Sequence, residues 1–308
     1  MPAIEVTDLK KHYGDLQAVD GISFNVNEGE VFSLLGPNGA GKTTTIEILE
    51  GLREKNGGEA MVLGLDPWSK GYELHKNIGV IPQGFKFLDY PTPREAIRYY
   101  ATLFGKKVDP DKLLKEVILD DAASKMWFMQ LSGGQKQKLG MALSLVNDPK
   151  LVFLDEPTTG LDPQARRAVW EVIRKLKEQG RTVLLTTHYL EEAEELADRV
   201  AIMNHGKIVA MGTPSEIVSK HGSGERLVVK AGEGLARYLR EHTKLRVESN
   251  GTGHVSVYLG HKKDALVALA AIDESGMEWS DLLTRRDSLE DIFLKLVGTE
   301  GLADEREK

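Results

Sequence analysis

The chain has 308 residues, of which 41% are hydrophobic, and carries a formal net charge of -7 at neutral pH. This length allows one large domain or two, and the acidic balance argues against a nucleic-acid-binding protein, which usually presents a basic face. Because the sequence has no cysteine, disulfides, thiolate catalysis and cysteine-based metal sites are excluded. No window approaches the roughly 20 apolar residues of a membrane helix, and the first residues lack a signal core. If the protein acts at a membrane, we therefore expect it to do so through a partner protein.

The first 25 residues alternate between apolar and polar side chains, as in residues 4–6 and 21–26. This alternation predicts strands that form an antiparallel β patch. Residues 30–35 are then typical of a short buried strand.

A phosphate-binding loop follows that strand. Residues 36–43 fit the pattern G-x-x-x-x-G-K-[ST], and a helix is expected to start at Thr43. Glycines let backbone N–H groups point at phosphate oxygens, and a helix N-terminus favours negative charge. We expect Lys42 to reach the terminal phosphates and the Thr43 hydroxyl to hold Mg²⁺. The sequence therefore predicts binding of a nucleoside triphosphate by Gly36, Pro37, Asn38, Gly39, Ala40, Gly41, Lys42, Thr43 and Thr44.

The middle of the chain predicts a helical subdomain inside an α/β fold. Residues 78–81 form another short apolar run, and a helical pattern extends from Thr92 to about residue 147, so the subdomain is placed at about 85–147. Strands and helices then alternate: strands at 151–154, 182–187, 200–203 and 208–211, and helices at 163–179 and 190–199. This alternation is typical of a largely parallel sheet. A hairpin turn signal at 204–207 precedes the last of these strands, so the predicted sheet is mixed.

The strand at 151–154 ends in two acidic residues. Asp155 stands where a strand-end carboxylate can hold Mg²⁺ through water. Glu156 can polarise a water molecule for in-line attack on the γ-phosphorus. A plain acidic strand end is the alternative, which the phosphate loop upstream disfavours.

The pattern restarts after a predicted linker at 221–225. Its order, β-α-β-β-α-β, predicts a small α+β domain of ferredoxin-like arrangement, followed by an amphipathic helix at 288–297. The predicted domains are thus 1–222 and 225–300, with a disordered charged tail at 301–308.

The segment Leu131-Ser132-Gly133-Gly134-Gln135 resembles the signature motif of the ATP-binding-cassette (ABC) family. Together with the loop at 36–43 and the acids at 155–156, it identifies the chain as a member of this family of P-loop NTPases. A serine and two glycines that open a helix form a second anion site. The resemblance therefore implies that Ser132, Gly133, Gly134 and Gln135 bind the nucleotide held by a partner chain.

Further positions carry roles that the resemblance implies. Tyr13 would stack on the adenine, and Gln83 would touch Mg²⁺ or water and sense the transporter partner. Leu161 and Asp162 would cross the dimer interface, although Asp162 is also a good helix N-cap. His188 would contact the γ-phosphate, whereas a lone histidine at a strand end is usually structural.

The tail at 225–297 resembles the regulatory or dimerisation extension of ATPase subunits from daunorubicin-type, sodium and haem-type two-component exporters. The ABC resemblance implies a head-to-tail dimer that hydrolyses ATP on the cytoplasmic side of the membrane, peripheral to a membrane permease. The presence of every expected catalytic residue favours a homodimer. The permease would dock near residues 83–104, where core packing is the alternative for the six aromatic residues at 85–104. The same choice holds for the apolar residues of the segment 127–130 before the signature, which are Trp127, Phe128 and Met129.

Two other functions remain open: a soluble ABC ATPase without a transporter, and a module that senses ATP without turnover. The single cassette and the presence of Glu156 and His188 favour the exporter subunit. The acids Glu191, Glu192, Glu194 and Glu195 are predicted to form a solvated helix face, with no chemistry assigned.

Overall fold

The computed structural model describes residues 2–222, 224–249 and 253–298, so the predicted tail at 301–308 lies outside the described residues. Two compact units make up the chain, one from Met1–Pro214 with Leu296–Lys308 and the other from Ser215–Lys295. The domain boundaries at 222 and 225 stay predictions.

A six-stranded mixed sheet forms the centre of the first unit, in the order β5-β6-β7-β3-β8-β9. The strands are β3 (Val31–Leu35), β5 (Ile78–Ile81), β6 (Leu151–Asp155), β7 (Thr182–Thr187), β8 (Arg199–Asn204) and β9 (Lys207–Gly212). All neighbours are parallel except the hairpin of β8 and β9. Every residue of β3, β6 and β7 is buried, which agrees with their largely apolar sequences. The predicted α/β fold with a mixed sheet is confirmed.

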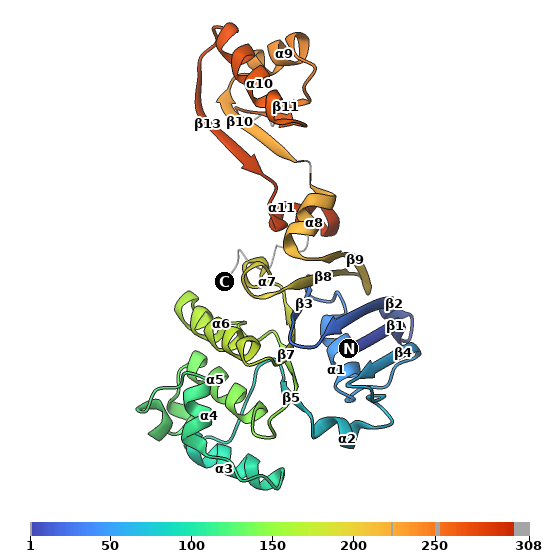
Figure 1. The fold of residues 1–308 in the computed structure, drawn as a ribbon, viewed down its shortest axis with the longest axis vertical. Helices are drawn as coiled ribbons and strands as arrows, with labels where there is room; N and C mark the ends of the chain where they lie inside the picture. Colours follow the sequence, from blue (N-terminus) through green and yellow to red (C-terminus); the bar gives the residue numbers. More distant parts are fainter. Residues whose placement is uncertain (1, 223, 250–252, 299–308) are drawn as a thin grey trace. The chain divides into compact units, whose positions relative to one another are not determined.

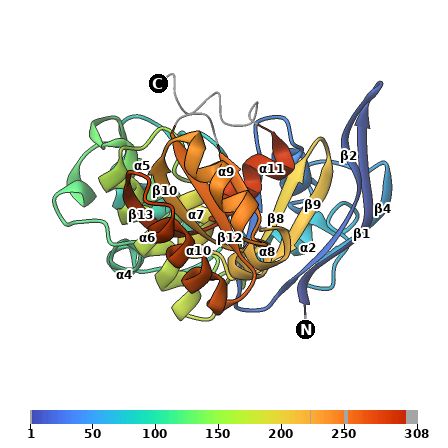
Figure 2. The ribbon, with the colours of Figure 1, turned by 90° about the horizontal axis from the view of Figure 1, so that it is seen from above.

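The predicted antiparallel patch is also present, in the order β2-β1-β4. Its strands are β1 (Pro2–Tyr13), β2 (Leu16–Asn27) and β4 (Gly57–Val62). Their inward side chains share one core with β3 and with helix α1 (Lys42–Leu49), through residues such as Ile22, Phe32 and Ile46. A short helix, α2 (Gly71–His75), precedes β5. This patch lies on one side of the central sheet's unit in both views (Figures 1 and 2).

Helices gather on the other side of this unit, as the green and yellow-green segments of Figure 1 show. They are α3 (Pro93–Leu103), α4 (Pro110–Glu116), α5 (Gly133–Ser144) and α6 (Pro163–Glu178), with short 3-10 turns at Ala123–Lys125 and Phe128–Gln130. A second core joins them to the sheet through residues such as Ile97, Leu139, Val152 and Ile173. Helix α7 (Leu190–Leu196) ends earlier than predicted because Ala197 already has an extended backbone.

The second unit contains a four-stranded antiparallel sheet in the order β11-β12-β10-β13. Its elements are α8 (Pro214–His221), β10 (Glu225–Ala231), α9 (Glu233–His242), β11 (Val247–Ser249), β12 (His254–Leu259), α10 (Lys262–Glu274), β13 (Trp279–Arg286) and α11 (Leu289–Val297). A separate core includes Leu227, Leu239, Val255 and Ile272. Helix α8 was not predicted, although Pro214 at its first position is a helix-start signal.

Among the described residues, none of the helices combines the length and the apolar character that a membrane span requires.

Candidate functional site

The loop at residues 36–41 connects β3 to the N-terminus of α1. Two of its glycines cannot be replaced without moving the backbone. A Cβ at Gly36 would lie 2.4 Å from the carbonyl oxygen of Met203, and one at Gly41 would lie 2.3 Å from that of Ala18. Gly41 also has a φ of +100°, which side chains other than glycine rarely adopt. The loop is therefore held tightly against β2 and β8.

Lys42 begins α1, and only 4% of its surface is exposed. Its ammonium donates to the carbonyl oxygens of Gly36, at 2.7 Å, and Pro37, at 3.1 Å. The same nitrogen lies 3.3 Å from Oε1 of Glu156. Burial lowers the pKa of Lys42, and the charges of Glu156 and Asp155 oppose that effect. A phosphate at this loop would therefore compete with Glu156 for the ammonium.

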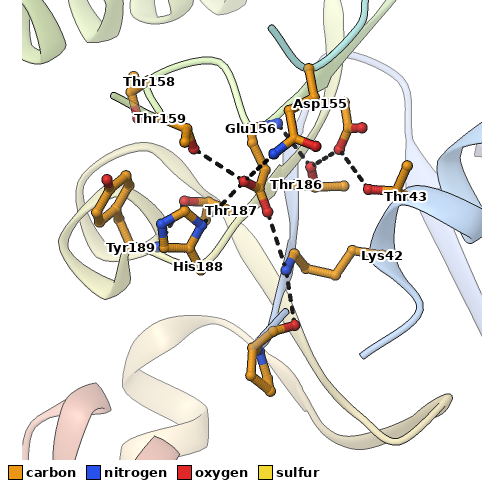
Figure 3. A network of polar contacts seen from close by, with 12 residues as sticks. Lys42, Thr43, Asp155, Glu156, Thr158, Thr159, Thr186, Thr187, His188 and Tyr189 are labelled. Atoms are coloured by element: carbon orange, nitrogen blue, oxygen red, sulfur yellow. Dashed lines mark hydrogen bonds and ion pairs between the residues drawn. The ribbon is translucent and has the colours of Figure 1, made fainter. Parts of the chain in front are cut away.

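Asp155 and Thr43 face each other at the carboxyl end of β6 (Figure 3). Oδ1 of Asp155 accepts hydrogen bonds from the hydroxyls of Thr186, at 2.5 Å, and Thr43, at 3.4 Å. Burial raises the pKa of Asp155, against the effect of both hydroxyls and of Lys42. No group of three or more acidic or histidine side chains within the described residues could hold a metal ion. Mg²⁺ needs only one or two carboxylates beside substrate phosphates, so the pair Thr43 and Asp155 fits it.

Glu156 is the most densely contacted carboxylate of the site (Figure 3). Its Oε2 accepts from the Gln83 amide at 2.9 Å and from the Thr159 hydroxyl at 3.1 Å, and lies 3.3 Å from Nδ1 of His188. Burial by itself would raise the pKa of Glu156, but His188, Lys42 and Thr159 outweigh it and lower the pKa to about 2. The residue is thus ionised at neutral pH.

The backbone of Glu156 is strained, with a φ of +46°. Left-handed backbone at a residue other than glycine costs free energy and is concentrated at functional sites. The side chain of Glu156 lies between Lys42 and His188 (Figure 3).

A cavity of about 520 Å³ opens beside these residues. Among its lining residues are Tyr13, Lys42, Thr43, Gln83 and Glu156. Tyr13 is 40% exposed, and its ring is flanked by the cationic ends of Lys11, at 5.3 Å, and Arg53, at 5.4 Å. An exposed ring at the rim of a polar cavity provides a flat face on which a base can stack.

Several predicted site residues are absent from the described lining of this cavity, namely Gly36, Pro37, Ala40, Asp155 and His188. The predicted partner-facing residues Ser132, Gly133, Gly134, Gln135, Leu161 and Asp162 are absent from it as well. They lie together elsewhere. Ser132 and Gln135 form a capping box that opens α5, with hydrogen bonds of 3.0 and 3.3 Å. A Cβ at Gly133 would lie 3.1 Å from Leu161, so this helix start packs directly on the segment before α6.

Glu192 is a buried group for which the prediction from the sequence is wrong. It was predicted to belong to a solvated face, but the structure buries it completely. Its neighbour four residues on is Leu196, which is also buried. The helical spacing therefore carried a signal that the count of acidic residues obscured.

Comparison with known proteins gives the family. The model of the ABC transporter family matches residues 19–159. Nod factor export ATP-binding protein I from Rhizobium sp. (strain N33) is 39% identical, over 97% of this chain and 98% of that protein. The chain belongs to the ATP-binding proteins of ABC transporters. As the family resemblance implied, it is an ABC ATPase subunit that hydrolyses ATP for transport.

Other proteins that are similar to this ABC ATP-binding protein are also described as ATP-binding proteins or ABC cassettes. The daunorubicin/doxorubicin resistance ATP-binding protein of Streptomyces peucetius is 37% identical, over 96% of this chain and 92% of that protein. A solved ATP-binding subunit of an ABC transporter is 30% identical with a TM-score of 0.62, covering 71% of this chain and 92% of that one. A dimeric structure of a bacterial ABC transporter cassette is 25% identical with a TM-score of 0.60, over 68% and 98%.

Proposed function

We propose that this protein powers export through a separate integral membrane permease, working as a peripheral subunit on the cytoplasmic side of the membrane. Two relatives that span nearly the whole chain are named for export and for drug resistance. The observation that carries the proposal is the meeting of Lys42, Glu156 and His188 at the carboxyl ends of β3, β6 and β7.

Nucleotide binding would use both sides of the cavity. Tyr13 stacks on the adenine, and the backbone N–H groups of residues 36–44 with Lys42 hold the phosphates. Thr43 and Asp155, together with Gln83, would hold Mg²⁺, which would neutralise phosphate charge when bound.

Hydrolysis would then depend on Glu156, His188 and Gln83. Glu156 orients the attacking water and accepts its proton, for which an ionised carboxylate is required. His188 stabilises charge on the γ-phosphoryl group. Gln83 donates to Glu156 and thereby positions this carboxylate.

A second copy of the chain would complete each site. The helix start at Ser132, with Gly133, Gly134 and Gln135, is exposed or partly exposed apart from Gly134 and belongs to no described part of the cavity. In a head-to-tail homodimer it would face the γ-phosphate bound by the partner, with Leu161 and Asp162 at the interface. The dimeric state of a solved cassette supports this arrangement.

The permease would dock on the surface near residues 83–104. The aromatic side chains there divide into two groups. Phe85, Phe87 and Tyr100 pack against the helical core, whereas Tyr90, Tyr99 and Phe104 are exposed together with Leu88 and Leu103. Trp127 is also exposed and stacks edge-on with Tyr90, while Phe128 is buried. An exposed apolar face of this kind suits a helix of a partner.

For the second unit we propose a ferredoxin-like fold that regulates or dimerises the cassette, within a domain spanning about 225–300. Its four antiparallel strands, with one helix after β10 and one after β12, support this assignment.

The decisive experiment compares the parent chain with Glu156→Gln. We expect the variant to bind Mg-ATP as the parent does, to lose hydrolysis by about 10²–10⁴-fold, and to elute as a dimer in Mg-ATP. Tagged variant protein should also recover an integral membrane protein from detergent-solubilised membranes. Parent-level hydrolysis by the variant would refute the catalytic assignment. Recovery of ribosomes or DNA-associated proteins instead would refute the transporter assignment. As a control, Lys42→Ala should weaken ATP binding itself.

A further inference from the structure

A buried carboxylate outside the nucleotide cavity ties three segments together. Glu192, in the first turn of α7, is completely buried. Its Oε1 accepts hydrogen bonds from the Thr158 hydroxyl at 2.9 Å and from the Trp170 indole N–H at 2.9 Å. Thr158 follows Glu156 by two residues, and Trp170 lies on α6. Helix α7 is therefore held to both the segment after the proposed base and α6.

The start of α7 is held to α6 at a second point. His188 and Tyr189 immediately precede the helix, with their ring centroids 4.2 Å apart. The guanidinium carbon of Arg166, on α6, lies 4.0 Å from the centroid of Tyr189. Arg166 and Trp170 are thus two contacts, one helical turn apart, between α6 and the segment that carries His188.

Stability alone does not account for a carboxyl group at this position. Burial raises the pKa of Glu192, and the hydrogen bonds and the charge of Arg166 only oppose that effect. Its Oε2 makes no hydrogen bond of good geometry with a described residue, and the Thr187 hydroxyl is the side chain that most opposes the effect of burial on the pKa of Glu192. Burying a polar group of this kind costs free energy. A protein with an apolar residue of similar volume at such a position is often at least as stable. The neighbouring buried positions of α7, Ala193 and Leu196, are apolar.

We propose that Glu192 is a positioning residue for ATP hydrolysis. By holding Thr158 and Trp170, it fixes the His188 segment against the segment 156–162. It thereby keeps the His188 imidazole at its 3.3 Å distance from Glu156. This inference rests on the roles proposed above for Glu156 and His188.

The test measures kcat and KM for Mg-ATP with the full-length chain. Glu192→Gln keeps an acceptor oxygen for both donors and should stay within about threefold of the parent kcat. Glu192→Leu removes the acceptor and should lower kcat at least tenfold while KM changes less than twofold. Glu195→Leu and Glu195→Gln are matched controls, because this exposed residue lies on the same helix and forms its ion pair with the exposed Arg174. The proposal is overturned if Glu192→Leu keeps the parent kcat, or if Glu192→Gln loses as much kcat as Glu192→Leu does. It is also overturned if KM rises in Glu192→Leu by as large a factor as kcat falls.

A double variant separates positioning of His188 from a general structural effect. If Glu192 acts through His188, adding Glu192→Leu to His188→Ala should slow hydrolysis less than twofold further. A full tenfold further loss would contradict the proposal. Should Glu192→Leu fail to fold, Thr158→Val removes one donor at nearly constant volume, and we expect about a threefold lower kcat at unchanged KM.

The outcomes distinguish the proposed function of the ATP site from the positioning role of Glu192. If His188→Ala or Glu156→Gln hydrolyses ATP at the parent rate, the proposed function of the site is wrong, and the positioning role is wrong with it. If both are slow while the Glu192 and Thr158 variants match the parent, only the inference about Glu192 is wrong.

Discussion

At the scale of single residues, Glu50 is the clearest example of a charge set by packing. It follows α1 and is almost fully buried. Burial, with the negative charges of Asp155 and Glu47 adding to it, raises the pKa of Glu50 from 4.5 to about 8. The folded protein therefore keeps a proton on Glu50 at neutral pH that the unfolded chain has lost.

This difference predicts a pH-dependent stability. Below about pH 4.5 both states bind the proton, and between 4.5 and 8 only the folded state does. The contribution of Glu50 to the free energy of unfolding is therefore fully present at low pH and is lost as the pH rises toward 8. Glu50→Gln removes this titration, so its stability relative to the parent should rise by about 1–3 kcal/mol between pH 5 and 8. Urea unfolding in EDTA measures it. Glu54→Gln, at an exposed position, is the control. The prediction is wrong if the difference in free energy of unfolding between Glu50→Gln and the parent does not change with pH.

The same residues show what the sequence predicts of the site and what it does not. Lys42, Thr43, Asp155 and Glu156 could be found because each belongs to a short motif whose spacing is local. The hydrogen bond from Gln83 to Glu156 and the burial of Glu50 depend on neighbours from distant segments. No pattern within one segment reports such contacts.

At the scale of elements, the start of α6 combines a structural and a proposed functional role. Asp162 is the N-cap of this helix and accepts from the backbone N–H of Ala165 at 2.9 Å. The same residue is proposed to lie at the dimer interface. Its two roles can be separated because asparagine preserves the cap and alanine does not.

We expect Asp162→Ala to lower the free energy of unfolding by about 1 kcal/mol, and Asp162→Asn by only a few tenths. Urea unfolding of the monomeric chain without nucleotide gives these values. Dimerisation in Mg-ATP, measured on Asp162→Asn, then reports the interface role alone. Equal stability of Asp162→Ala and the parent would show that the cap contributes nothing.

Elements with a strong period or a continuous apolar run were predicted well, such as β6, β7 and α6. Strand β4 was not, because it begins with Gly57 and Gly58, which weaken a strand signal. The linker predicted at 221–225 is shorter in the structure, since His221 ends α8 and Glu225 begins β10. Tertiary pairing decides such marginal segments.

At the scale of the whole molecule, the two units have separate cores. The first unit, which is the ATP-binding cassette, has two hydrophobic cores, one on each side of its central sheet. The second unit has one hydrophobic core, built from β10, β11, β12, α9 and α10. The residues that line the nucleotide cavity run from Tyr13 to His205, all within the first unit. Nucleotide binding should therefore not require the second unit.

A chain that ends at Glu225 tests this directly. Because the cavity and both cores of the cassette are retained, we expect its Kd for ATP to stay within about twofold of the parent value. Removing a unit proposed to dimerise or regulate should change the dimer yield of the Glu156→Gln variant in Mg-ATP, or the coupling of hydrolysis to transport. Equilibrium binding of a fluorescent ATP analogue and size-exclusion chromatography measure the two effects, with circular dichroism as the control for folding. If the truncated chain folds but does not bind ATP, the cassette depends on the second unit. Unchanged dimerisation together with unchanged transport would rule out both proposed roles of that unit.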